Sequence, residues 1–163
     1  MAYQKLQVSE GLVVIPSATI PIPDPSTEVL SGTADFSVAG TLTDVGTTFL
    51  SAGIQNNAIV YNTTANIAYF VTTVTDDLNL ALSPASAGGA ADNYVIYNAP
   101  TEGCILYVGG TGDLVAVLAS DKDVPAATQN ELTFKNLPNA SFLPTQVFRV
   151  DSTTTATDII ALW

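Results

Sequence analysis

Aspartates are the residues of this chain whose type and spacing come nearest to those of a functional site. Asp113, Asp121 and Asp123 lie beside Gly- or Pro-containing segments, and their carboxylates suit a divalent cation held between subunits. Asp76 and Asp77 separate two apolar runs, where Asp commonly closes a turn by bonding to its own backbone. No Glu follows at the spacing that a calcium loop of the EF-hand type needs. We therefore expect no metal site, and keep Asp113, Asp121 and Asp123 as the weak candidates.

The residue types that most enzymes use are missing. The chain has no His and one Cys, which excludes Ser–His–Asp and Cys–His couples, imidazole ligands, an internal disulfide and a thiolate zinc cage. Glycines at 109, 110 and 112 lack the Lys-Ser/Thr of a phosphate-binding loop, and are expected to supply positive φ in a hairpin. Cys104 is expected to be a buried hydrophobe. We predict no catalytic residues, no enzyme and no cofactor; the enzymatic alternative is a glycosidase with two carboxylates across a cleft.

Composition and charge restrict the partners. The chain has 163 residues, of which 47% are hydrophobic and 12% charged, with fifteen acidic residues against four basic ones and a net charge of −11. Phosphate backbones are bound by clusters of Lys and Arg, and this sequence has none. Nucleic acid and anionic membrane are therefore not expected as partners. The start, MAYQKLQVSE, lacks the basic and apolar regions of a signal peptide, which predicts synthesis in a host cytoplasm.

The hydrophobic pattern is that of a β protein. Short apolar runs rich in Val, Ile, Thr, Tyr and Phe recur about every ten residues and are separated by Gly, Pro, Asn and Asp. No helical periodicity competes with them. The pattern predicts an all-β sandwich or barrel, with strands at 12–15, 19–22, 58–61, 67–74, 78–82, 94–97, 104–108, 114–118, 132–135, 146–150 and 159–163.

Two Pro-rich segments suggest an insertion. Residues 21–25 and 98–103 read as connectors, because Pro fixes φ and cannot donate to a strand ladder. We predict that residues 31–99 form a small β-barrel-like module. It would be inserted into an outer domain made from residues 1–30 and 100–163, a jelly-roll-like β-sandwich. The alternative is one continuous β-sandwich with two Pro-rich loops.

Several apolar residues near the end of the chain are candidates for an interface. Trp163 ends the chain, where residues fray unless they are tied down, and Trp is enriched at interface hot spots. The apolar residues 142–144 follow a turn, and the only Arg suits a carboxylate inside the chain or on a neighbouring subunit. The interface candidates are Phe142, Leu143, Pro144, Arg149, Ile160, Leu162 and Trp163. Core packing is the alternative for the apolar ones.

Short ordered motifs resemble those of a known family. The chain is similar over residues 1–26 and 100–163 to the head spike base and capsid decoration proteins of tailed bacteriophages and gene transfer agents. The matching segments are YQKL (3–6), VIPSATIPIP (14–23), GCILYVGG (103–110), FKNLPNASFLP (134–144) and TTATDIIALW (154–163). Residues 41–97 separately resemble a small β-module found repeatedly in phage virion proteins.

This resemblance implies a function. We expect a non-enzymatic virion structural protein, a head decoration or spike base protein on the capsid exterior. It would self-assemble into a trimer or pentamer and bind the major capsid protein and other virion proteins. The alternative is a carbohydrate- or receptor-binding β-module of a phage tail or fibre. Sugars would then stack on the aromatic residues Tyr61, Tyr69, Phe70, Tyr94 and Tyr97.

Overall fold

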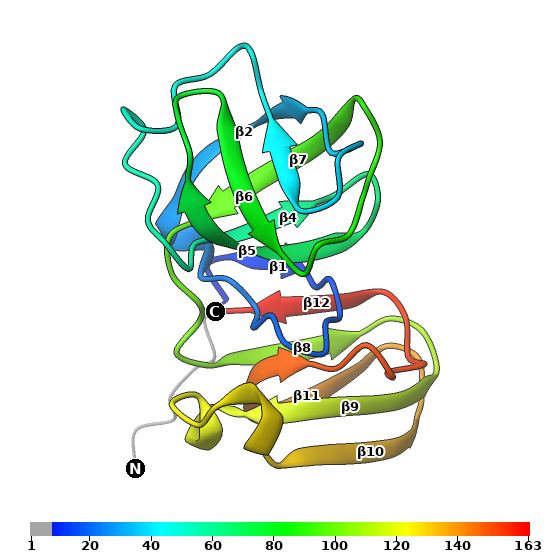
Figure 1. The fold of residues 1–163 in the computed structure, drawn as a ribbon. Helices are drawn as coiled ribbons and strands as arrows, with labels where there is room; N and C mark the ends of the chain where they lie inside the picture. The colour runs from blue at the N-terminus through cyan, green and yellow to red at the C-terminus, as the bar shows by residue number, and fades with distance from the viewer. Residues whose placement is uncertain (1–7) are drawn as a thin grey trace.

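The computed structural model describes residues 8–163, whose strands form two antiparallel six-stranded sheets (Figure 1). The all-β prediction is confirmed. Within the described range the helical elements are single 3-10 turns, η1 (Pro25–Thr27), η2 (Ala119–Asp121) and η3 (Ala126–Thr128). None of these turns has the length or apolar content that a membrane-crossing helix needs.

The first sheet has the strand order β1-β12-β8-β11-β9-β10. Its strands are β1 (Gly11–Val13), β8 (Cys104–Val108), β9 (Gly112–Leu118), β10 (Glu131–Leu137), β11 (Ser141–Val150) and β12 (Ile159–Leu162). Strand β11 pairs first with β8 and then with β9. Its pairing with β8 shifts register between Leu143 and Val147, and Pro144 falls inside this irregularity. Pro is tolerated there because a bulged stretch leaves backbone N–H groups outside the ladder.

The second sheet has the order β2-β7-β4-β5-β6-β3. Its strands are β2 (Glu28–Ala34), β3 (Thr41–Thr43), β4 (Ile59–Asn62), β5 (Ile67–Val74), β6 (Asn79–Ser83) and β7 (Asp92–Tyr97). A bridge between Asp35 and Thr43 links the two edges of the sheet, which therefore curls towards a small barrel. The barrel encloses an aromatic core in which the rings of Phe36 and Phe49 pack edge-on against Tyr94.

The segment that follows β1 lies between the two sheets and contacts both. Val14 and Ile22 are buried in the core of the first sheet. Ile15 and Ile20 join a separate cluster with residues of β4, β5 and β7, on the face of the second sheet that points away from the barrel core. Residues 19–22, predicted as a strand, lie outside any sheet, although the Ile22 amide donates to Phe148 O at 3.0 Å in β11.

The two sheets are drawn from different parts of the sequence. The first uses residues 11–13 and 104–162, and the second uses residues 28–97. Strand β2 pairs with β7 from Glu28 onward, so the boundary expected after residue 30 falls within a strand. Near the connectors, Pro23 and Pro100 form a bridge where the chain enters and leaves the second sheet. Independent folding of residues 31–99 stays a prediction.

Candidate functional site

The outer face of the first sheet carries a row of apolar side chains across four neighbouring strands. The register aligns Val13 with Ile160, Ile160 with Tyr107 and Tyr107 with Phe142. Because successive side chains on a strand point to opposite faces, these residues point outward while their neighbours fill the core. Val13 is 65% exposed and Phe142 is 60% exposed. The Tyr107 and Phe142 rings lie 5.2 Å apart between centroids.

A second, shorter row lies beside the first. Leu162 is aligned with Ile105, and Pro144 follows two residues after Phe142 on the same side of β11. We call the combined surface the apolar face; it comprises Val13, Ile105, Tyr107, Phe142, Pro144, Ile160 and Leu162. None of these seven side chains carries a charge.

One end of the apolar face is hollowed. Ile105 and Pro144 line a shallow depression of about 570 Å³ together with Leu118, Thr145 and Gln146. Its rim is completed by Ala119 and Ser120 of η2. The depression has room for a bulky side chain of a partner, and interface anchors typically fill pockets of this kind.

The interface candidates divide between this face and the core. Phe142, Pro144, Ile160 and Leu162 gather on the apolar face, whereas Leu143 points inward and is buried. Sequence reasoning missed Val13, Ile105 and Tyr107. The signal was the alternation in 104–108, where the positions between buried Cys104, Leu106 and Val108 are also apolar.

Arg149 is buried inside the chain, with 1% of its side chain exposed. Its guanidinium pairs with Asp151 and Glu131, both at 3.0 Å, and donates to Gln129 Oε1 at 3.2 Å and Ser17 O at 3.1 Å. Burial acts to raise the pKa of Asp151, but hydrogen bonds from Thr153 and the Arg149 charge hold it below its usual value. The guanidinium therefore joins three segments of this chain.

Trp163 is held at the edge of the first sheet. Its backbone N–H donates to Glu10 O at 3.1 Å, and its carbonyl accepts from the Ser9 amide at 2.7 Å. The half-buried indole packs against the core cluster of the first sheet and donates to Thr101 Oγ1 at 2.9 Å. The last residue thus stabilises the chain end beside the apolar face.

The acidic candidates are not brought together. Asp113 accepts from the Asn136 amide at 2.8 Å, Asp121 accepts from the Asn130 amide at 2.9 Å, and Asp123 pairs with Lys122 at 3.3 Å. Across residues 8–163, no group of three His, Cys, Asp or Glu is placed to hold a metal ion. Asp76 lies in the turn between β5 and β6, where its carboxylate accepts from the Leu78 amide at 2.8 Å.

The glycines at 109, 110 and 112 and Cys104 have structural roles. Gly112 has φ +151°, but Gly109 and Gly110 serve a different purpose from the expected positive φ. A Cβ on either would press against Asp158 or Thr157, so the glycines permit close approach of the 157–158 loop. Cys104 is buried, and burial raises the pKa of its thiol to about 12.

The aromatic residues of the second sheet offer no exposed platform for a sugar. Tyr61, Tyr69, Tyr94 and Tyr97 are all buried, and Phe70 is half-buried. Tyr94 donates from its hydroxyl to Asp44 Oδ2 at 2.7 Å. These rings pack the two clusters of the second sheet, and sugar stacking requires an exposed ring face.

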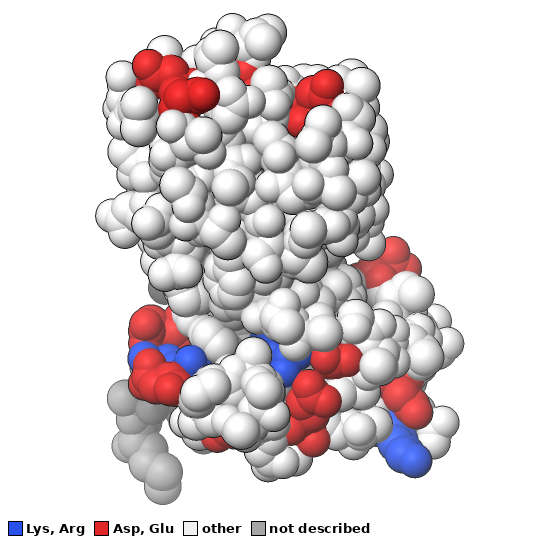
Figure 2. Space-filling model, in the orientation of Figure 1, with Lys and Arg blue, Asp and Glu red and all other residues white. Residues whose placement is uncertain are grey.

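Comparison with known proteins gives no match: no family model, no curated protein and no solved structure is similar to the chain. The surface offers a candidate contact region, and its charge is unevenly distributed. In the view of Figure 2 the acidic groups gather at the far end of the second sheet and over the first, and a broad middle is uncharged. Contiguous exposed apolar patches mark interaction sites on soluble proteins, and the apolar face is such a patch.

Proposed function

We propose that this chain is a non-enzymatic structural protein of a phage head, a decoration or spike base protein that self-assembles and binds the outer capsid surface. The observation that carries the proposal is the in-register row Val13–Ile160–Tyr107–Phe142, which crosses four strands of the first sheet. The resemblance of residues 1–26 and 100–163 to head spike base and decoration proteins supplies the virion context. Of the resembling motifs, residues 3–6 lie outside the described residues.

The charge distribution favours self-association through this face. Each copy carries a net charge of −11, so contact between two copies is opposed least where a surface without acids is buried. The apolar face has no charged side chain to strip of water, which removes the largest cost of burying an interface. Full burial of one large apolar side chain contributes roughly 1.5–3 kcal/mol. Val13, Phe142 and Pro144 are the exposed members of the face, so they gain the most from burial in a contact.

A symmetric oligomer also suits attachment to a shell. A trimer or pentamer binds the lattice through several copies of one weak contact. Its overall affinity for the shell therefore greatly exceeds the affinity of a single contact. The acidic surface disfavours packaged DNA, because phosphate binding requires clustered Lys and Arg. Both properties favour a position on the capsid exterior.

Heads that lack this protein test the proposal directly. They would be purified after deletion of the gene from the element that encodes it, then mixed with the purified protein and sedimented. We expect saturable binding at a fixed ratio to the major capsid protein, resistant to nuclease and weakened by Phe142→Asp. Absence of the protein from wild-type heads, together with no binding to the deletion heads, would contradict the proposal.

A further inference from the structure

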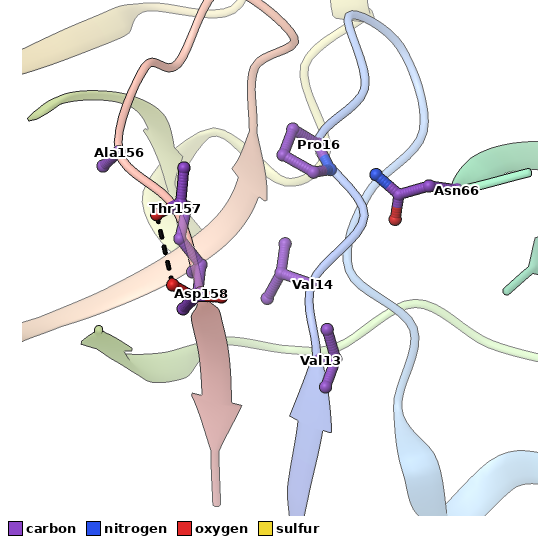
Figure 3. Close-up of a pocket in the computed structure, with 8 residues that line it drawn as sticks. Val13, Val14, Pro16, Asn66, Ala156, Thr157 and Asp158 are labelled. Atoms are coloured by element: carbon purple, nitrogen blue, oxygen red, sulfur yellow. Dashed lines mark hydrogen bonds between the residues drawn. The ribbon is translucent and has the colours of Figure 1, made fainter. Parts of the chain in front are cut away.

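Two hollows adjoin β1, and together we call them the groove. The larger, about 410 Å³, lies between β1 and the second sheet, and the smaller, about 280 Å³, lies towards residues 156–159 at the start of β12; Val13 and Asn66 line both. Figure 3 shows Val13, Val14 and Pro16 along the chain that leaves β1, with Thr157 and Asp158 on one side and Asn66 on the other. The larger hollow is walled by Ile15 and by Tyr61, Val95 and Tyr97 of the second sheet.

The backbone of β1 presents a free edge to this groove. Among the strands of residues 8–163, β1 is the outermost of its sheet and pairs with β12 alone. On that paired side, Val14 N donates to Ile159 O at 2.9 Å and Glu10 O accepts from Trp163 N at 3.1 Å. Because alternate residues of a strand bond to opposite sides, the N–H and C=O groups of Gly11 and Val13 point away from β12. An edge of this kind is a template for another strand.

Polar groups in the groove suit a peptide backbone. Asn66 lies in the turn between β4 and β5 with φ +57°, and its amide, which has both a donor and an acceptor, faces the groove. A strand lying along β1 would find donors and acceptors on one side and an apolar wall on the other.

The segment best matched to the groove is the start of the chain. Residues 1–7 directly precede the described part and contain Tyr3 and Leu6, and their charged side chain is that of Lys5. The larger hollow, which lies beside the free edge of β1, is lined by no charged side chain and by the apolar residues Leu12, Ile15 and Val95. Seven extended residues reach about 23 Å, longer than the edge that β1 and the following residues to Pro16 offer.

We propose that residues 1–7 of one copy add as a strand to the free edge of β1 in a neighbouring copy. This exchange rests on the self-assembly proposed above. Folding back onto the same copy requires a turn at residues 8–10, but the backbones of Ser9 and Glu10 are bonded to Trp163 in line with β1. The bonded backbone of residues 9–10 therefore favours exchange between copies over folding back. Val13 belongs to both the groove and the apolar face, so a neighbour docked on that face lies next to the groove.

Disulfide trapping in the full chain tests the exchange. Gln4→Cys would be purified separately from Thr63→Cys, whose exposed side chain lines the groove, and the two would be mixed and oxidised. Thr133→Cys on exposed β10 is the matched control for Thr63→Cys. Cys104 is buried and has a raised thiol pKa, so it stays out of the reaction. Maleimide labelling confirms that each introduced thiol is reactive.

The expected result is a disulfide-linked heterodimer of Gln4→Cys with Thr63→Cys, at least tenfold more abundant than with Thr133→Cys. The double variant Gln4→Cys/Thr63→Cys should form interchain links. Equal yields with the two Thr variants would overturn the proposal, as would a purely intrachain link in the double variant at low concentration. If the protein is oligomeric by light scattering but gives no specific link, the exchange fails while self-assembly stands.

Discussion

The indole Nε1–H of Trp163 donates to Thr101 Oγ1 at 2.9 Å, although the two residues are 62 positions apart in the chain. Together with the backbone bonds to Ser9 and Glu10, this contact fastens Trp163 to the segment before β1 and to the connector that returns from the second sheet. Trp163 is thus part of the fold, and it fixes the strand that presents Ile160 and Leu162.

Removal of this hydrogen bond should weaken the fold. Trp163→Phe keeps an aromatic ring but lacks the N–H, so the free energy of unfolding should fall by about 1 kcal/mol. Thr101→Val should lower the free energy of unfolding by a similar amount. The double variant should lower it by less than the sum of the two single losses. Urea denaturation measures all three. Strict additivity would show that the two side chains are not coupled.

Loss of Arg149 should be much more damaging than loss of an exposed cation. Arg149→Met leaves the buried Asp151 without its charge partner, and breaking a buried pair typically costs about 3–5 kcal/mol. Lys135→Met on exposed β10 is the matched control and should change stability by less than about 0.5 kcal/mol. Similar midpoints for the two variants in urea would contradict this role of Arg149.

Asp151 should also make the fold sensitive to acid. Its pKa is below the ordinary 3.8 in the folded chain, so its stabilising contribution is complete above that pH and is lost as the pH falls through the folded value. The free energy of unfolding should therefore decline below about pH 4. Asp151→Asn should be less stable than the wild type at pH 7 and should lose less on acidification. A wild-type stability that is flat from pH 5 to below pH 3 would contradict the prediction.

Two core tyrosines should respond differently to the same change. The buried Tyr69 hydroxyl has no hydrogen-bond partner within residues 8–163, whereas the Tyr94 hydroxyl donates to Asp44 at 2.7 Å. Tyr69→Phe should leave the free energy of unfolding unchanged or raise it by up to about 1 kcal/mol, since an unpaired buried hydroxyl is costly. Tyr94→Phe should lower it by about 1.5–3 kcal/mol. Thermal or urea unfolding of the two variants measures the difference. Equal losses in the free energy of unfolding would contradict the different roles of the two hydroxyls.

The fold class could be predicted from the sequence because each sheet core is built from strongly apolar, β-branched runs. Strands β4 to β9 and β12 lie where alternation and turn residues place them, give or take a few residues. Strand β2, with the sequence EVLSGTA, escaped notice because it holds only two large apolar residues. It forms because β7 pairs with it, and a Cβ at its Gly32 would lie 3.3 Å from the Tyr94 ring, so glycine leaves room for that ring. Such tertiary pairing overrides local propensity.

The candidate site could be predicted only in part for a related reason. Phe142 and Ile160 attract attention in the sequence, but they are far apart in the chain. Their alignment depends on Tyr107 of β8, which pairs with both. Register between distant strands is a tertiary property, so the row of four apolar residues appears only once the sheet order is known. Arg149 stands out in the sequence as the only Arg. Its intrachain partners could not be predicted, because they come from three segments of the chain.

The most direct test of self-assembly is the mass of the purified protein in solution, by light scattering coupled to gel filtration. The wild type should be a trimer or pentamer, and Phe142→Asp on the apolar face should shift it to monomers. Val45→Asp makes a similar apolar-to-acid change at an isolated, 84% exposed position beyond β3, and should leave the oligomer intact. Circular dichroism would confirm that both variants are folded. A monomeric wild type at high concentration, or equal masses for the two variants, would contradict the central claim.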